Sequence, residues 1–173
     1  YIDGVIVDGS SSGGGLLGGR QSGSDTIVSQ LRQAANDPTV KAVVLRVDSP
    51  GGSAYASDEI ARAVSKVQDE GKPVVASFGG VAASGGYYVA AGADTIWAEP
   101  NTVTGSIGVY TVKFAAEEML EHVGIETTTI ARGAHSDLYS MVDPWDASER
   151  ARVEALIQDT YDRFKEIVSE GQG

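Results

Sequence analysis

The sequence predicts an α/β fold in which helices flank a largely parallel sheet. Short β-prone runs alternate with stretches of helical spacing along the chain, and glycine- or proline-rich turns separate them. Residues 42–47 form a nearly continuous apolar run, as in strands buried on both faces. Strands that alternate with helices imply crossover connections and parallel neighbours. Because no repeat or linker divides the 173 residues, we expect one domain over residues 1–173.

Strands are expected where β-prone runs end at turn residues. Residues 1–7 form the first such run. Residues 9–23 are too rich in glycine and serine for regular structure, so we expect a flexible loop there. It is not a phosphate-binding loop, because no Lys-Ser or Lys-Thr pair follows its glycines. Further strands are predicted over residues 42–47, 73–77, 95–98, 107–110 and 125–130.

Helices are expected where apolar residues recur three and four positions apart. The first starts at Ser24 and ends at Asp37. The last is preceded by Asp146, which together with Glu149 resembles a capping box. Further helices are predicted around residues 60–67, 83–91, 114–123 and 147–170.

The composition excludes several classes of partner and cofactor. A net charge of -11, from 24 acidic and 13 basic residues, repels polyanions, so no nucleic acid is expected as a partner. The absence of cysteine excludes disulfides, Cys-ligated metals and thiol nucleophiles, and we expect no cofactor or metal. No apolar run reaches the roughly 18 residues of a membrane span, and no leader opens the chain.

Two loops at the carboxyl ends of predicted strands are the candidate site, because ligands bind at this edge of parallel sheets. The first, DSPGG at 48–52, joins a proline of fixed φ to two glycines, which lets backbone N–H groups turn outward. The second, FGGVAASGGYY at 78–88, places the hydroxyl of Ser84 among small residues. Their occurrence on successive loops of one sheet favours a functional site.

Ser84 followed by two glycines at a helix start has a use in nucleophilic catalysis. The hydroxyl stands exposed, the helix dipole favours negative charge, and the Gly85 N–H points at an oxyanion. Donors from the turn at Gly51 and Gly52 complete such an oxyanion hole. A simpler alternative is that the small residues only allow a helix to pack closely on the sheet, with Ser84 hydrogen-bonded to its own backbone.

Three stretches resemble one peptidase family. DSPGG at 48–52, VAASGGYYVAAGAD at 81–94 and TVTGSIGV at 102–109 have the order and spacing seen in the signal peptide peptidase A (protease IV) family. The resemblance extends from Tyr1 to about Gly133. It implies a Clp-crotonase-like layered fold and a serine endopeptidase with a Ser-Lys dyad, acting on signal peptides and other apolar peptides.

The resemblance also assigns residues and a location. Ser84 matches the nucleophile, Gly51 and Gly52 match the oxyanion region, and Ser106 matches the serine that hydrogen-bonds the lysine base. The family implies a homo-oligomer at the bacterial inner membrane, facing the periplasm, with the anchor outside this chain. Four residues near Ser84 are expected, from their size and lack of charge, to line the binding site for apolar substrate side chains: Val81, Ala82, Tyr87 and Tyr88.

The general base departs from the family pattern. Short members carry the lysine in a stretch like G-x-x-K-S, which here reads RGAHSD at 132–137, with His135 in the lysine position. Long members of the family are tandem duplications. In them the N-terminal half supplies the lysine and the C-terminal half supplies the serine. This chain resembles that C-terminal half. We therefore expect part of a longer protein, inactive alone, whose lysine comes from its upstream half or a neighbouring subunit.

Other hypotheses stay open at this stage. Lys113 lies closest to the TGSIGV stretch but begins an amphipathic helix, and His135 with Asp137 would form a Ser-His-Asp triad with Ser84. His122 is explained more simply by a helix C-terminus. Two different functions also remain: a non-catalytic assembly module of the same fold, and a crotonase-type acyl-CoA enzyme.

Overall fold

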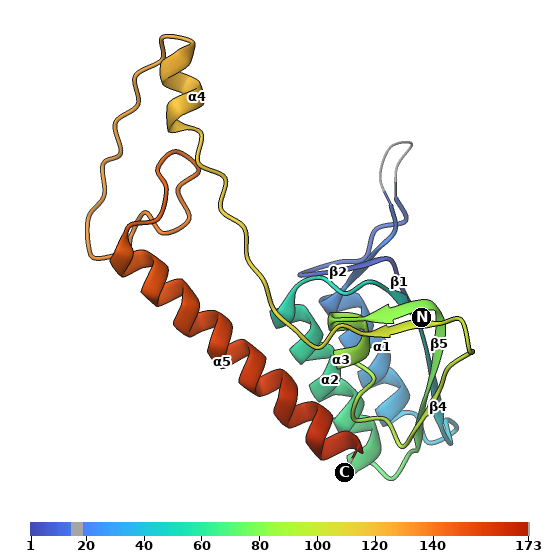
Figure 1. Cartoon of the computed structure of the whole chain (residues 1–173). Coiled ribbons are helices and arrows are strands. Elements are labelled where there is room, and N and C mark those ends of the chain that lie inside the picture. The colour runs from blue at the N-terminus through green and yellow to red at the C-terminus, as the bar shows by residue number, and fades with distance from the viewer. Residues whose placement is uncertain (15–18, 173) are drawn as a thin grey trace. The chain divides into compact units, whose positions relative to one another are not determined.

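The computed structural model describes residues 1–14 and 19–172 (Figure 1). The chain separates into two compact units, which we call the core unit (residues 1–108 and 162–173) and the small unit (residues 109–161). The single domain expected over residues 1–173 stays a prediction. Among the described residues, no helix combines the length and apolar character that crossing a bilayer requires.

The core unit is built on a parallel sheet. Its strands lie in the order β1-β4-β5-β6, and β7 pairs with the C-terminal part of β5. Every one of these pairings is parallel, which confirms the predicted sheet. A second parallel pair joins β2 and β3. The strands are β1 (Ile2–Asp3), β2 (Val5–Val7), β3 (Gln21–Gly23), β4 (Val43–Ser49), β5 (Val74–Ala83), β6 (Thr95–Trp97) and β7 (Val103–Gly105).

Helices α1 (Ser24–Asn36) and α2 (Ala54–Asp69) lie side by side along the sheet (Figure 1). Their inward side chains, such as that of Ile60, form a core with inward side chains of β4 and β5, such as those of Val47 and Val74. The outward side chain of Val44 is 69% exposed, so β4 is buried on one face only in the described chain. The predicted burial on both faces is wrong, because α1 and α2 cover only one side of this sheet.

The region around β3 corrects the predicted loop over residues 9–23. Residues 21–23 form β3, and Ser12 bridges to Gln21 through two backbone hydrogen bonds of 3.0 and 3.1 Å. Residues 15–18 lie outside the described residues. The residues of β3, Gln-Ser-Gly, are not β-prone, so the sequence gave no sign of this strand or of its pairing with β2.

Strand β5 is longer than predicted and runs through the expected turn at 78–80. The Asp48 carboxylate accepts the Val81 N–H at 3.0 Å, beside a register shift between Val47 and Ser49. A Cβ on Gly79 would lie 2.6 Å from Asp48 Cγ, so only glycine fits there. Gly79 therefore admits the Asp48 side chain, and the two glycines do not end the strand.

The small unit contains α4 (Glu117–His122) and the first part of α5 (Ala147–Gln172). The predicted capping box is confirmed, since Asp146 N–H donates to Glu149 Oε2 at 2.9 Å and Glu149 N–H donates to Asp146 Oδ1 at 2.7 Å. The strands predicted over 107–110 and 125–130 are absent from the described structure. Their apolar side chains, such as Tyr110 and Ile130, are exposed and have no neighbouring strand there.

Candidate active site

Ser84 lies at the sharp turn between β5 and α3 (Gly85–Tyr88). Its backbone has φ 51° and ψ -123°, a conformation that costs a non-glycine residue roughly 1–3 kcal/mol. The Ser84 N–H donates to Gly105 O at 2.9 Å, and the Ser84 carbonyl accepts two N–H groups of α3. Its hydroxyl caps no N–H of α3. This strand–turn–helix geometry is the one that presents a serine nucleophile.

The two glycines after Ser84 are required by close packing. A Cβ on Gly85 would lie 2.4 Å from the Oγ of Ser57, a buried residue of α2. A Cβ on Gly86 would lie 2.5 Å from the carbonyl oxygen of Ser49 at the end of β4. The backbone of α3 thus rests directly on α2 and β4. The simpler alternative for the small residues is correct in part, but it leaves the Ser84 hydroxyl without the backbone cap that it invoked.

The turn at Gly51 and Gly52 touches Ser84. Gly51 has φ 101°, and a Cβ there would lie 2.7 Å from Gly85 N and 2.8 Å from Ser84 Cβ. The Gly51 N–H donates to the buried Ser49 Oγ at 3.1 Å. Gly51 therefore contributes a close backbone approach, and its own N–H is already occupied.

The Gly52 N–H is a different kind of donor. Ile6 N–H donates to Gly51 O, and Ser53 N–H donates to Ile6 O, both at 2.9 Å. In a parallel bridge of this pattern, the middle residue, Gly52, directs its own N–H away from Ile6. Within the described chain, neither the Gly52 nor the Gly85 N–H has a hydrogen-bond acceptor. Gly52 N lies 3.3 Å from the Cβ position of Gly85, so two free donors lie close together beside Ser84.

Ser106 follows β7 directly. Ala83 pairs with Gly105, and the hydrogen bond from Ser84 N–H to Gly105 O continues this register by one residue. Ser84 and Ser106 therefore follow neighbouring strand ends, and both have φ 51°. Ser106 is exposed, and the Thr104 hydroxyl fastens β7 to β5 by donating to Ala82 O at 2.9 Å.

The predicted substrate contacts divide into two groups. Ala82 is fully buried, and Tyr88 is 6% exposed, with its ring against Phe164 of α5. Their side chains face the protein interior, which corrects the expectation that these two contact substrate. Val81 and Tyr87 are half-buried and stay predictions.

The lysines of the core unit are engaged elsewhere or remote. Lys41 Nζ donates to Pro38 O at 2.7 Å, and Lys72 Nζ donates to three carbonyl oxygens at the C-terminal end of α1. Lys165 pairs with Asp162 at 2.7 Å. Lys66 is exposed in the last turn of α2, about 13 Å along the helix axis from Ser57, which contacts Gly85.

The small unit holds the other candidate bases. The His135 ring Nε2 lies 2.7 Å from Ser148 Oγ, and within the described residues no hydrogen bond joins His135 to Asp137. Lys113 Nζ is buried 5.7 Å from the centre of the Trp145 ring, without a hydrogen-bond acceptor in the described chain. His122 lies in the last turn of α4, as a helix C-terminus predicts.

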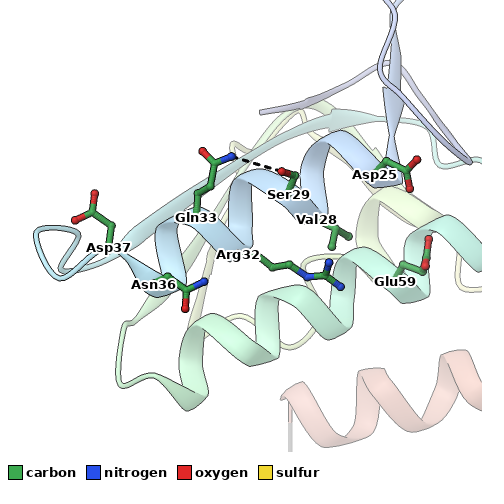
Figure 2. A pocket seen from close by; sticks show the side chains of 8 residues that line it. All are labelled: Asp25, Val28, Ser29, Arg32, Gln33, Asn36, Asp37 and Glu59. Carbon is green, nitrogen blue, oxygen red and sulfur yellow. Dashed lines mark hydrogen bonds between the residues drawn. The ribbon is translucent and has the colours of Figure 1, made fainter.

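An open hollow of about 720 Å³ lies between α1 and α2, away from these residues (Figure 2). Polar side chains such as Asp25 and Arg32 of α1 and Glu59 of α2 surround it. None of the predicted site residues lines it. The candidate site is therefore the backbone cradle around Ser84 and not this hollow.

Comparison with known proteins identifies the family. The profile described as "Peptidase family S49" matches residues 66–173, and that described as "Clp protease" matches residues 19–104. The chain belongs to peptidase family S49. The first match includes Ser84 and Ser106, and the second agrees with the parallel sheet, so the predicted family and the Clp-crotonase-like fold are confirmed.

Three S49 relatives extend over most of this chain. "Protease 4" of Haemophilus influenzae is 40% identical over 171 residues, 99% of this chain and 27% of that protein. "Putative signal peptide peptidase SppA" of Enterococcus faecium is 36% identical over 99% of this chain and 49% of that protein. "Serine protease SPPA, chloroplastic" of Arabidopsis thaliana is 39% identical over 83% of this chain and 21% of that protein. The chain thus spans half or less of the length of these relatives.

Two residues that contact the site, Ser49 and Asp58, were not singled out from the sequence. Ser49 was seen only as part of DSPGG, although its buried hydroxyl holds the Gly51 N–H. Asp58 gave no signal, and it accepts the Tyr88 hydroxyl at 2.8 Å.

Proposed function

We propose that this S49 chain carries the nucleophile and the oxyanion hole of a serine endopeptidase. Ser84 Oγ attacks the carbonyl carbon of a peptide bond, and the carbonyl oxygen becomes an oxyanion that accepts hydrogen bonds from the Gly52 and Gly85 N–H groups. The intermediate then expels the amine and leaves an acyl ester on Ser84, which water hydrolyses. The observation that carries the proposal is the pair of free N–H donors beside a strained, uncapped serine.

The general base is a lysine from outside the described chain, in the upstream half of the same polypeptide or in a neighbouring subunit. A neutral lysine amine takes the Ser84 proton and gives it to the leaving amine. The engagement of Lys41, Lys72 and Lys165 with other groups supports an external lysine. Ser106, exposed at the neighbouring strand end, orients the incoming amine.

Apolar peptides, including signal peptides at a membrane, are the proposed substrate class. Val81 and Tyr87 lie near Ser84 and bring no charge to the site. A relative named as a putative signal peptide peptidase supports the same substrate. We place the catalytic unit on the periplasmic side of a bacterial inner membrane, in a homo-oligomer anchored through a segment outside the described chain.

A fluorophosphonate probe tests the reaction class. The longer protein that contains this chain should be labelled stoichiometrically, and Ser84→Ala should abolish labelling and hydrolysis of an apolar peptide ester while retaining the melting temperature. Residual hydrolysis above about one part in a thousand would contradict Ser84 as nucleophile. The 173-residue chain alone should be inactive and should gain activity when its upstream half is supplied.

A non-catalytic assembly module is the second candidate, because His135 stands in the position of the lysine of short S49 members. In that case the folded longer protein would neither react with the probe nor hydrolyse the ester. A crotonase-type activity would instead give turnover of an acyl-CoA thioester that survives Ser84→Ala.

A further inference from the structure

Helix α3 is held on α2 at both of its ends. It comprises only the four residues Gly85–Tyr88, a single turn that is not stable by itself. At its start, Gly85 lies against the Ser57 hydroxyl, and at its end the Tyr88 hydroxyl donates to Asp58 Oδ1 at 2.8 Å. Two consecutive residues of α2 therefore contact the two ends of α3.

Tyr88 provides the polar anchor of α3. Gly85 and Gly86 have no side chains, so the direction of their N–H groups depends on contacts elsewhere in the turn. The Tyr88 ring is buried and packs edge-on against Phe164, with ring centres 4.9 Å apart. Burial and the hydrogen bond to Asp58 raise the pKa of Tyr88 well above its usual range, so the hydroxyl remains a donor at any pH at which the protein works.

Asp58 is itself fixed from two sides. Its carboxylate pairs with Arg62, one turn later on α2, and lies 3.8 Å from the Arg163 Nε of α5. Only 17% of the Asp58 side chain is exposed. The C-terminal part of α5, through Arg163 and Phe164, thus closes over the acceptor and the ring that hold α3.

We propose that Tyr88 and Asp58 are positioning residues of the oxyanion hole. Their hydrogen bond sets the orientation of α3 and so the direction of the Gly85 N–H, while the Phe164 ring prevents α3 from turning. This inference rests on the proposed peptidase function. Loss of an oxyanion donor typically costs a factor of about 10²–10³ in kcat, so a misdirected donor is expected to cost a factor of about ten.

The test uses the longer active protein and three substitutions. Tyr88→Phe removes only the hydroxyl, and Asp58→Asn retains an oxygen acceptor while removing the charge. Tyr55→Phe is the matched control, because its exposed hydroxyl also donates to a carboxylate on α2, Glu59, at 3.1 Å. We measure kcat and KM for an apolar peptide ester per probe-labelled site, together with the melting temperature.

Tyr88→Phe is expected to lower kcat about tenfold with KM unchanged, and Tyr55→Phe to change kcat less than twofold. Asp58→Asn should lower kcat less than Tyr88→Phe does, and the double variant should be no slower than Tyr88→Phe alone, because both substitutions act on one hydrogen bond. Equal kcat for Tyr88→Phe and Tyr55→Phe in a labelled, active protein overturns the inference.

Two further outcomes are distinct. If the unmodified protein is neither labelled nor active, the proposed function fails first. If Tyr88→Phe does not fold, Asp58→Asn combined with Arg62→Ala provides the comparison, and an unchanged kcat in that variant also overturns the positioning role.

Discussion

Replacing Ser84 by glycine should stabilise the protein while abolishing its activity. The left-handed φ of 51° at Ser84 is a conformation that glycine adopts freely and alanine does not. The strain released is about 1–3 kcal/mol, and the extra entropy that glycine gives the unfolded chain opposes this by about 0.4–1 kcal/mol. The net difference between Ser84→Gly and Ser84→Ala is therefore about 1 kcal/mol in favour of glycine.

Urea unfolding followed by circular dichroism measures this difference, and thermal unfolding should show glycine about 2–4 °C above alanine for a chain of this size. A matched pair at Ser65, in the regular helix α2, should give the opposite sign, with glycine about 1 kcal/mol less stable than alanine. If Ser84→Ala is as stable as Ser84→Gly while the Ser65 pair behaves as expected, the backbone at Ser84 is not strained and the reasoning from its φ is refuted.

Two other predictions concern neighbouring groups. Ser49→Ala leaves the Gly51 N–H without its acceptor, in the same turn that carries the Gly52 N–H. It should therefore lower kcat about tenfold at unchanged KM in the longer protein. An unchanged kcat in steady-state kinetics on a peptide ester would contradict this. Hydrogen bonds from the Val74 N–H and the Gln68 amide lower the pKa of Asp94, so this carboxylate stabilises the fold above the ordinary aspartate pKa and loses that effect as the pH falls. Acid unfolding of Asp94→Asn should accordingly begin from a lower stability near neutral pH but decline less steeply below pH ~4, and an unchanged acid slope would refute the coupling.

Elements in which apolar residues recur at a regular spacing are the ones predicted best from the sequence. Helix α1 begins at Ser24 and ends before Asp37 as expected, because apolar spacing and a proline mark both ends. Residues 107–110 are rich in β-prone residues, as β4 is, yet no described strand lies beside them. A strand needs a partner whose position is set by tertiary structure, and composition alone does not supply one.

The same distinction applies within the site. The glycines at 51, 85 and 86 can be recognised from the sequence, because a close approach of two backbones tolerates no other residue. In the structure, a Cβ at any of these three positions would lie too close to a neighbouring atom. Ser84 is recognisable for a related reason, since a hydroxyl set among such residues has few structural uses. Backbone constraints of this kind restrict the residue type at a position, so they can be predicted from the sequence without coordinates.

Tyr88 illustrates the opposite case. Its place beside Ser84, its size and its lack of charge suggested a substrate contact. The hydroxyl instead reaches Asp58, 30 residues earlier in the chain, and the ring reaches Phe164 of α5. Nothing in the sequence around Asp58 or Phe164 marks either residue as a partner of Tyr88. Only the fold brings α5 over α3. A tyrosine whose ring and hydroxyl are both satisfied by the protein has no polar group left for a substrate. The effect that we propose for Tyr88 on catalysis therefore passes through the backbone that it anchors, which is the turn that carries the Gly85 N–H.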